Sequence, residues 1–559
     1  MRYSEFVEVY ETLSSTTKRL EKEDILSEFL KKLAKNGESE WIYLLRGRVV
    51  PDYDSREFGI SVQLVAKAIS KSLGIKPDKV VSEFRKVGDL GEIAEEFARR
   101  KRQSVLFSSK LTVKKVFENL KKLLDVEGKG AVDKKMGLIS EILGSAEPLE
   151  AKYIVRTLLN DLRVGVADAI LRDAISEIAF GEDKKEMEDK VEEAYDLAND
   201  FALVFDSAME GKRALEKINI SPGRAVKVML PVKVTEIGDA FRICGKPAAI
   251  EHKYDGFRMI ITKDNGEVKL FTRRLENVTN QFPDVVKEVK KNVKGSSFIL
   301  DSEVVGYDPK SKKYMPFEAI SQRIKRKYHI EQLIKKLPVE INIFDILYYN
   351  GESLLDLDFV KRRERIKKIV KPEKYKIRLS YQIVTSDERE AEEFYKNALK
   401  IGEEGIMFKK LDAKYRQGRR VGYIVKLKPA VNDLDLVIVG AEYGSGKRGG
   451  LLTSYIVACK NNGEFLEVGK VASGLKEKES ELGTTYEEMT ELLKPLILEE
   501  KGKYVRVRPE LVVSVTYQNI QKSPSYDSGF AMRFPRITAY RPDRYIEDIA
   551  TLNDIKKLL

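Results

Sequence analysis

Cysteine and histidine are nearly absent from this sequence. Its 559 residues include two cysteines, Cys244 and Cys459, and two histidines, His252 and His329. Two cysteines exclude a four-cysteine zinc site and a disulfide framework. A Ser-His-Asp triad would need one of the two histidines, and neither lies in a recognisable nucleophile setting. Any catalytic chemistry is therefore expected from other charged residues.

Long apolar segments are missing too. No apolar run approaches the roughly 18 residues that indicate a membrane-spanning helix, and the N-terminus lacks the apolar core of a signal peptide. We predict an intracellular, cytoplasmic protein that does not contact a membrane.

Charge, in contrast, is abundant. Charged residues make up 34% of the chain, and 101 Lys and Arg against 89 Asp and Glu leave a net charge of +12. The basic residues are spread along the sequence, which is typical of a multidomain protein whose domains all face a polyanion such as nucleic acid. A solvated surface rich in Lys and Glu is the alternative explanation of the charge alone.

The spacing of apolar residues changes twice along the chain. Residues 1–215 repeat apolar positions at intervals of three and four, which predicts an all-α domain. From about Ile250 the period becomes two, with a hairpin signal at Asp264-Asn265-Gly266, and residues 216–430 are predicted to form an α+β domain. Strands and glycine-rich turns in residues 431–559 predict a small β-barrel of the OB-fold kind with a C-terminal helix. The predicted fold class is therefore multidomain, with all-α, α+β and β-barrel parts.

Three predicted strands carry paired charges on one face. Side chains of a strand alternate between its two faces. This alternation pairs Glu251 with Lys253, Asp301 with Glu303, and Lys426 with Lys428. Each pair alone fits an amphipathic strand facing water, whereas together they indicate a charged cleft over a hydrophobic core. His252 falls on the opposite face and is expected only to pack.

Lys253 is the candidate nucleophile of this cleft. A lysine with the ordinary pKa of about 10.4 is a poor nucleophile at neutral pH, and cationic neighbours and desolvation activate it. Lys426, Lys428 and a bound metal ion would do so while holding phosphate oxygens. Glu303 and Glu404 are hard oxygen ligands of the kind that Mg²⁺ prefers. The set suits phosphoryl or nucleotidyl transfer.

Six short motifs occur in one order along the chain. They are K-x-D-G-x-R at 253–258, T-R-R at 272–274, D-S-E at 301–303, F-D-I-L-Y at 344–348, E-G-I-M-F-K at 404–409 and K-L-K at 426–428. With them the chain resembles the nucleotidyltransferase superfamily of ATP-dependent DNA ligases, RNA ligases and mRNA capping enzymes. Residues 528–544 look like the closing barrel motif of replicative DNA ligases, and residues 148–175 are similar to their helical DNA-binding domain. The resemblance is greatest to the archaeal ATP-dependent DNA ligases.

This resemblance implies the reaction and the roles of the matched residues. Lys253 would attack the α-phosphate of ATP and hold AMP, which then passes to the 5′-phosphate of a nick before the 3′-hydroxyl displaces it. The implied roles are adenine recognition for Glu251, ring stacking for Phe344, ribose and DNA phosphate contacts for Arg258 and Arg273, Mg²⁺ binding for Glu303 and Glu404, α-phosphate binding for Lys426 and Lys428, and pyrophosphate orientation for Arg541, Asp543 and Arg544.

Three positions depart from the family pattern. Ser302 stands where D-G-E has glycine, and Ile424 replaces the common tryptophan before K-x-K. Arg544 ends the closing motif where lysine is usual, and the two side chains are not equivalent phosphate ligands. None of the three removes a chemically essential group.

The implied partners are nicked duplex DNA, ATP and Mg²⁺, and we predict a monomer. Gln103, Leu106 and Phe107 are spaced like the short sliding-clamp-binding motif of archaeal ligases, although a loop between two helices accounts for the same spacing. The motifs do not separate ATP from ADP or GTP.

Two alternatives stay open beside a DNA ligase. An RNA ligase or capping enzyme shares the motifs but usually lacks a helical module of this length before the lysine. A non-catalytic nucleic-acid-binding scaffold would not need the nucleophile, both carboxylates and both lysines that this chain retains. An NAD⁺-dependent ligase would require a zinc-binding set of cysteines that the sequence does not contain.

Overall fold

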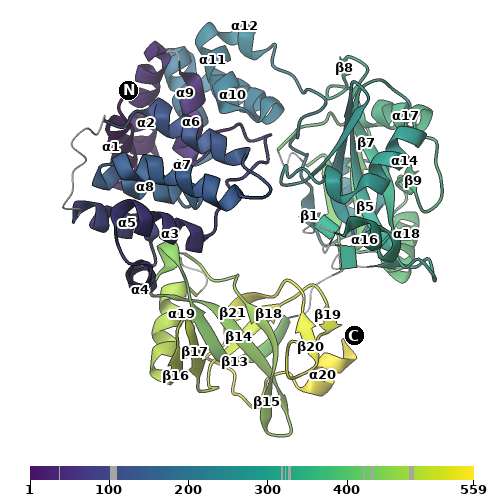
Figure 1. The fold of residues 1–559 in the computed structure, drawn as a ribbon. Helices are drawn as coiled ribbons and strands as arrows, with labels where there is room; N and C mark the ends of the chain where they lie inside the picture. Colours follow the sequence, from purple (N-terminus) through teal and green to yellow (C-terminus); the bar gives the residue numbers. More distant parts are fainter. Residues whose placement is uncertain are drawn as a thin grey trace. The chain divides into compact units, whose positions relative to one another are not determined.

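The computed structural model describes residues 1–36, 38–100, 110–315, 319–320, 323–324, 329–418, 422–429, 433–477 and 484–558. Figure 1 shows the ribbon with its helices and strands labelled. The chain divides into two compact units. The first comprises residues 1–84 and 90–429, and the second comprises residues 85–89 and 430–559.

Residues 1–215 form helices, and no strand occurs among the described residues of this segment. The predicted apolar spacing explains them: in α6, Val113, Val116 and Leu120 are fully buried on one face, while the hydroxyl of Thr112 caps the first turn by accepting from Lys115 N–H (3.2 Å). The elements are α1 (Tyr3–Ser14), α2 (Arg19–Asn36), η1 (Ser39–Arg46), α3 (Val62–Leu73), α4 (Pro77–Val87), α5 (Leu90–Arg99), α6 (Val113–Leu124), α7 (Ala131–Ser145), α8 (Pro148–Leu158), α9 (Asp168–Phe180), η2 (Gly181–Asp183), α10 (Lys184–Ala198), α11 (Phe201–Glu210) and α12 (Lys212–Leu215).

Two sheets follow in the first unit. The smaller has the order β1-β12-β11-β2-β10, and the larger has the order β4-β3-β5-β7-β8 with β6 beside β5 and β9 beside β7. The strands are β1 (Val232–Val234), β2 (Ala248–Lys253), β3 (Phe257–Asp264), β4 (Glu267–Thr272), β5 (Phe298–Tyr307), β6 (Tyr314–Met315), β7 (Val339–Tyr349), β8 (Glu352–Ser353), β9 (Ile377–Leu379), β10 (Gln382–Thr385), β11 (Gly405–Lys410) and β12 (Ile424–Leu427).

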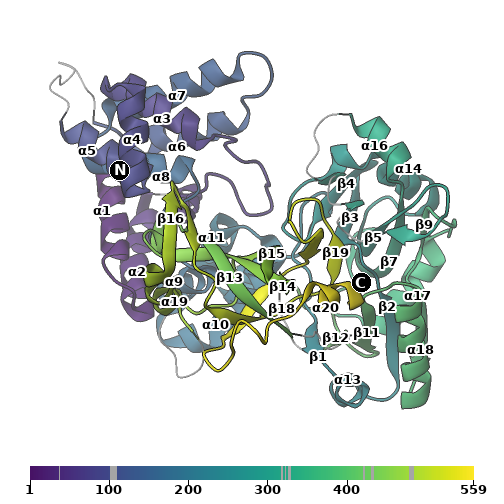
Figure 2. The ribbon, with the colours of Figure 1, turned by 90° about the horizontal axis from the view of Figure 1, so that it is seen from below.

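Helices cover one face of each sheet. Helices α13 and α18 lie beside the smaller sheet (Figure 2), and their apolar residues pack on it. The apolar residues of α14 and α17 pack on the larger sheet. A third cluster joins the other faces of the two sheets, for example Ile260 and Ile299 with Ile424. The helical elements are α13 (Ile237–Cys244), η3 (Thr279–Gln281), α14 (Pro283–Asn292), α16 (Ile330–Lys336), α17 (Phe359–Ile369) and α18 (Glu388–Lys400).

The predicted hairpin joins β3 to β4. Asp264 pairs with Glu267, and the two residues between them, Asn265 (φ 47°) and Gly266 (φ 81°), both adopt positive φ. A two-residue turn of this kind suits the twist of antiparallel strands, so the Asn-Gly signal is confirmed.

The segment from Ser221 to Pro231 contains neither helix nor strand. It is nevertheless packed, because Ala225, Val226 and Met229 are each 2% exposed. The apolar residues of this segment therefore belong to the interior of the first unit.

The second unit contains a curled antiparallel sheet. The long strand β13 pairs with β18 through Asp433–Val437 and with β17 through Gly440–Glu442, and its pairing with β14 carries two register shifts that bend it. The remaining elements are β13 (Asp433–Tyr443), η4 (Gly446–Arg448), β14 (Leu452–Asn461), β15 (Glu464–Val471), α19 (Tyr486–Leu493), η5 (Lys494–Leu496), β16 (Ile497–Lys501), β17 (Tyr504–Val507), β18 (Val512–Thr516), β19 (Ile520–Lys522), β20 (Phe530–Met532), β21 (Arg536–Tyr540) and α20 (Leu552–Lys557).

The helical, mixed and strand-rich parts occur in the predicted order, which confirms the predicted fold class. The boundaries at 215/216 and 430/431 stay predictions, and residues 430–432 lie outside the described part of the chain. Among the helices that the structure describes, none combines the length and the apolar character that a bilayer crossing requires.

Candidate active site

Lys253 is the last residue of β2, where it pairs with Gly405 of β11 in the smaller sheet. Its ammonium forms an ion pair with the carboxylate of Glu404, and Glu404 N–H donates to the Lys253 carbonyl oxygen (2.9 Å). Lys428 Nζ reaches the same Glu404 oxygen at 2.6 Å. The structure therefore brings three sequence-predicted residues together as two lysines around one carboxylate.

The charges of this trio depend on one another. Burial opposes ionisation of Glu404, but Lys253 and Lys428 lower the pKa of its carboxyl to about 2. Burial and the positive charge of Lys253 lower the pKa of Lys428, against the pull of Glu404. Glu404 is therefore a fixed anion between two cations at neutral pH.

Glu303 lies on the larger sheet, directly opposite Arg258 in the pairing of β5 with β3. Burial raises the pKa of Glu303 to about 7, although Lys253 and Arg258 both favour its charged form. The nearby Glu404 adds to the rise. Glu303 and Glu404 therefore lie close enough to interact, each also influenced by Lys253.

Arg258 is held by a buried polar network. Its Nε and Nη2 donate to the two oxygens of Asp301 (2.9 and 2.5 Å), and Nη1 donates to the Met229 carbonyl (2.8 Å). Nη2 also donates to the hydroxyl of Tyr415 (3.2 Å), which in turn donates to Asp301 (2.6 Å). Four of the five N–H donors of the guanidinium are thus engaged within the described residues, which leaves one for a ligand.

Phe344 and Glu251 lie beside a buried lysine that had no assigned role. Lys409 Nζ is 4.3 Å from the Phe344 ring centroid and 2.7 Å from Glu251 Oε2. Gln382 donates to Glu251 Oε1 (2.7 Å), and Glu251 is 2% exposed. The Arg258 guanidinium is 5.4 Å from the same ring. These contacts bring an aromatic ring of the larger sheet and an oriented carboxylate of the smaller sheet to the same lysine.

Lys426 and Arg273 are the other two predicted site residues of the first unit. Lys426 lies in β12, half-buried and paired with Met407, two residues before Lys428. Arg273 follows β4 and is exposed.

The three residues of the closing motif lie in the second unit. Arg541 donates to both oxygens of Asp543 (2.8 and 2.6 Å), and Arg544 Nε lies 3.4 Å from Asp435 Oδ2. The Arg541 guanidinium lowers the pKa of the exposed Asp543 carboxyl to about 2. The predicted clamp-binding residues Gln103, Leu106 and Phe107 lie outside the described residues.

Two motif glycines are required by close approach. A Cβ at Gly256 would overlap the carbonyl oxygen of Val304 and lie 3.2 Å from Glu303 Cγ. Gly405 has a φ of 147°, and a Cβ there would overlap the carbonyl oxygen of Leu427. Gly256, three residues after Lys253, and Gly405, directly after Glu404, therefore let the strands that carry the charged residues approach each other closely.

Two departures from the family pattern have local compensations. Ser302 is fully buried, and its hydroxyl donates to the Met259 carbonyl (2.7 Å). Ile424 is 5% exposed and packs in the cluster that contains Tyr415. The Ser302 hydroxyl therefore has a hydrogen-bond partner, and Ile424 fills its position in the core in place of the usual tryptophan.

Four further residues contact the predicted site residues but were not assigned a role from the sequence. Asp301 and Lys409 stand inside motifs, so their positions could have indicated a role. Tyr415 and Gln382 stand outside every motif. Glu403, next to Glu404, is a further buried carboxyl near the site. Burial raises its pKa to about 8, although a backbone hydrogen bond from Asp255 favours the charged form.

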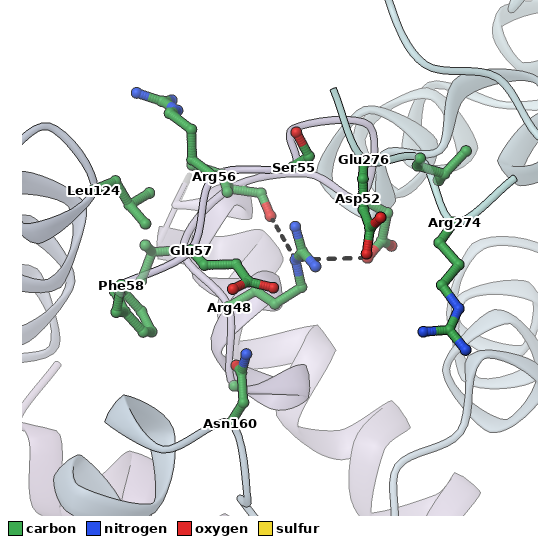
Figure 3. Close-up of a pocket in the computed structure, with 14 residues that line it drawn as sticks. Arg48, Asp52, Ser55, Arg56, Glu57, Phe58, Leu124, Asn160, Arg274 and Glu276 are labelled. Atoms are coloured by element: carbon green, nitrogen blue, oxygen red, sulfur yellow. Dashed lines mark hydrogen bonds and ion pairs between the residues drawn. The ribbon is translucent and has the colours of Figure 1, made fainter. Parts of the chain in front are cut away.

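A pocket of about 230 Å³ lies elsewhere in the first unit and does not include Lys253 (Figure 3). Arg48 lies toward Asp52 on one side of it, with an Arg48 Nε to Asp52 Oδ1 distance of 3.6 Å, and Arg274 lies on another. Its lining mixes both signs of charge, and no ligand is assigned to it.

A lysine paired with a carboxylate and a second lysine, near an aromatic ring and an oriented glutamate, is the arrangement that the resemblance to the nucleotidyltransferases predicts. The family model "ATP dependent DNA ligase domain" matches residues 228–428, "DNA ligase N terminus" matches 2–176, and "ATP dependent DNA ligase C terminal region" matches 448–544. A DNA ligase of Nanoarchaeum equitans is 45% identical over 100% of this chain and 98% of its own length. A DNA ligase of Thermococcus fumicolans is 42% identical over 100% and 98%, respectively.

The chain therefore belongs to the ATP-dependent DNA ligases, enzymes that use ATP to join DNA strands. The solved structure "Pmar-Lig_PreS3" covers 96% of this chain and 99% of its own at a TM-score of 0.57 and 17% identity, which shows a shared fold. The alternatives of an RNA ligase, a capping enzyme and a non-catalytic scaffold are set aside by these matches.

Proposed function

We propose that Lys253 is the residue that carries AMP during nick sealing. Its Nζ loses a proton and bonds to the α-phosphorus of ATP as the bond to the pyrophosphate oxygen breaks. The AMP then passes from Lys253 to the 5′-phosphate of a nick in duplex DNA. The 3′-hydroxyl attacks that phosphate, forms the phosphodiester bond and releases AMP.

The observation that supports this proposal is the trio of Lys253, Glu404 and Lys428. A second lysine 2.6 Å from the carboxylate that binds the nucleophile places a positive charge where a phosphate would approach. Cationic neighbours of this kind activate a lysine and stabilise the negative charge that develops on phosphate oxygens. Lys426, two residues earlier on the same predicted face, would share the α-phosphate with Lys428.

The nucleoside is proposed to bind between Glu251, Phe344 and Arg258. Phe344 would stack on adenine, and Glu251 would accept a hydrogen bond from its amine because Gln382 and Lys409 hold the carboxylate in one orientation. The remaining donor of Arg258 would reach the ribose. Arg273, which is exposed, would contact DNA phosphate.

Mg²⁺ fits the two carboxylates of the site. Glu303 is a buried carboxyl whose ionisation is costly without a nearby cation, and Glu404 is a fixed anion beside it. Mg²⁺ is typically bound by one or two carboxylates together with substrate phosphates and water. Glu303 and Glu404 would hold the ion, which supplies charge neutralisation for the transferred phosphate.

The closing motif of the second unit is proposed to orient the leaving pyrophosphate through Arg541 and Arg544, with Asp543 fixing Arg541. Arginine suits this task because its planar guanidinium binds two phosphate oxygens at once.

Covalent labelling tests the assignment of Lys253. Full-length protein incubated with α-labelled ATP and Mg²⁺ is expected to become labelled, and Lys253→Ala is expected to abolish the label. Lys246→Ala is the matched control, because Lys246 forms an exposed surface pair with Glu388 (2.8 Å). Equal labelling of Lys253→Ala and the control would show that another residue is the nucleophile.

A chase of the labelled protein tests the substrate. Nicked duplex DNA is expected to take up the label and be sealed, whereas nicked RNA is expected to react poorly. Parallel labelling with ADP and GTP measures the nucleotide preference that the motifs leave open.

We also propose that the chain is a cytoplasmic monomer of three domains bounded at 215/216 and 430/431, and that Gln103, Leu106 and Phe107 bind a sliding clamp. Limited proteolysis tests the boundaries, and light scattering tests the monomer. Clamp binding is measured with and without Phe107→Ala, which is expected to weaken it without changing labelling by ATP.

A further inference from the structure

Asp435 contacts both arginines of the closing motif. It lies in β13, directly opposite Ser514 of β18. Its two oxygens accept from Arg541 Nη1 at 3.4 and 3.3 Å, and its Oδ2 lies 3.4 Å from Arg544 Nε. A single carboxylate on the sheet therefore connects two guanidinium groups that follow β21.

The sheet fixes Asp435 in place. The hydroxyl of Ser514 donates to Asp435 Oδ1, and the Asp435 carbonyl accepts from Ala550 N–H (2.9 Å). Arg541 Nη1 also donates to Ser514 Oγ (3.3 Å). The strand pairing of β13 with β18 thus holds the carboxylate, the hydroxyl and one guanidinium as a unit.

Asp543 binds Arg541 at shorter distances but cannot fix it to the sheet. Asp543 is 61% exposed and stands two residues from Arg541, outside the strands of the sheet. Asp435 is 18% exposed and belongs to a strand more than a hundred residues earlier. In the described part of the chain, the contacts with Asp435 and with its hydrogen-bonded neighbour Ser514 relate the Arg541 guanidinium to the sheet of the second unit.

We propose that Asp435 is a positioning residue for lysine adenylation, which holds Arg541 and Arg544 in the orientation that meets pyrophosphate. The inference rests on the proposed function of those two arginines and adds the residue that orients them. A guanidinium held in advance loses less rotamer freedom when it binds phosphate, so positioning favours the step in which pyrophosphate leaves. Asp435 acts through the arginines and does not contact the substrate.

Asp435→Asn in the full-length protein tests this role. The substitution keeps the size of the side chain and removes the charge that both arginines contact. Two rates are measured: formation of the lysyl-AMP protein from ATP in a single turnover, and sealing of a nick whose 5′ end already carries AMP, which needs neither ATP nor pyrophosphate release. We expect adenylation to fall by about 10- to 100-fold and the sealing rate to stay close to that of the unmodified protein.

Asp433→Asn is the matched control. Asp433 is on the same strand two residues earlier and accepts from Thr538 (3.2 Å), and no contact with Arg541 or Arg544 is found for it in the part of the chain described. It removes the same charge, so a general change of surface charge would slow both variants alike. Equal rates for the two variants would overturn the proposal, and so would an equal loss of adenylation and sealing by Asp435→Asn, which indicates only a folding defect.

Arg541→Ala separates this inference from the function on which it rests. If Arg541→Ala leaves adenylation unchanged, the proposed role of the arginine itself is wrong. If Arg541→Ala slows adenylation while Asp435→Asn matches Asp433→Asn, the arginine acts without Asp435. In the double variant the two losses are expected to be less than additive, because Asp435 acts in part through Arg541.

Discussion

Lys253 and Glu404 are joined twice, once through their side chains and once through their backbones. The ammonium and the carboxylate form an ion pair, and Glu404 N–H donates to the Lys253 carbonyl oxygen over 2.9 Å. The backbone bond fixes the distance between the two chains at this point. The position of the proposed nucleophile is therefore set by the pairing of β2 with a segment about 150 residues later in the chain.

Glu404→Gln is expected to reduce lysine adenylation by at least about 100-fold, since one change removes a fixed charge of the reacting centre and a proposed Mg²⁺ ligand. Without the carboxylate, Lys253 and Lys428 would also face each other with no anion between them. Single-turnover labelling with ATP measures the effect. Glu388→Gln, which breaks the exposed pair with Lys246, is the control and is expected to leave labelling unchanged. Similar labelling of both variants would contradict the role of Glu404.

Gly256→Ala is expected to slow adenylation by about tenfold or more, because the added methyl group overlaps the Val304 carbonyl and pushes on Glu303. The same substitution at Gly238 is the control. Gly238 is the second residue of α13, and outside its own helix backbone and chain neighbours no atom lies within 4 Å of an added Cβ, so alanine there is expected to leave adenylation unchanged. An active Gly256→Ala variant would show that the turn can relax without moving Glu303.

The sequence allowed the main parts of the fold to be predicted because apolar spacing reports which side of an element is buried. Helices up to Leu215 and the β3–β4 hairpin followed from local patterns alone. His252 was expected to pack on the face opposite Lys253, and its ring lies 4.8 Å from that of Phe394 and 5.1 Å from that of Tyr381. The period of the apolar residues alone indicates which face of a helix or strand is buried, whichever elements it packs against.

The residues that orient the site could not be predicted in the same way. Tyr415 binds Arg258, Asp301 and Met229, and these lie between 114 and 186 residues away from it in sequence. Gln382 binds Glu251 only because β10 pairs with β2. A sequence motif indicates the residues that contact a substrate. The residues that orient those side chains are brought to them by strand pairing between distant segments, which local sequence patterns do not indicate.

Arg362→Met is expected to lower the free energy of unfolding by about 3–5 kcal/mol, because it leaves a buried carboxylate without its partner. Arg362 and Asp345 form a bidentate pair (2.7 and 3.0 Å) and are 0% and 2% exposed. Urea unfolding followed by circular dichroism measures the loss. Glu388→Gln, at an exposed pair, is expected to cost less than about 1 kcal/mol. A similar cost for both variants would mean that water reaches Asp345 and replaces the guanidinium.

His252→Phe is expected to make the protein less sensitive to acid. Burial lowers the pKa of His252 to about 4 from its ordinary 6.5, with Arg378 adding to the shift and Glu251 opposing it. Between about pH 4 and 6.5, His252 therefore binds a proton more readily in the unfolded chain than in the folded protein. The stability contributed by neutral His252 is present above about pH 6.5 and is lost as the pH falls towards 4. The phenylalanine ring would pack against Phe394 and Tyr381 without titrating. Urea unfolding at about pH 7 and about pH 4.5 is expected to show a smaller loss for the variant by about 1–2 kcal/mol. His329→Asn, at an exposed histidine, is the control, and an acid sensitivity of His252→Phe equal to that of the control would contradict the prediction.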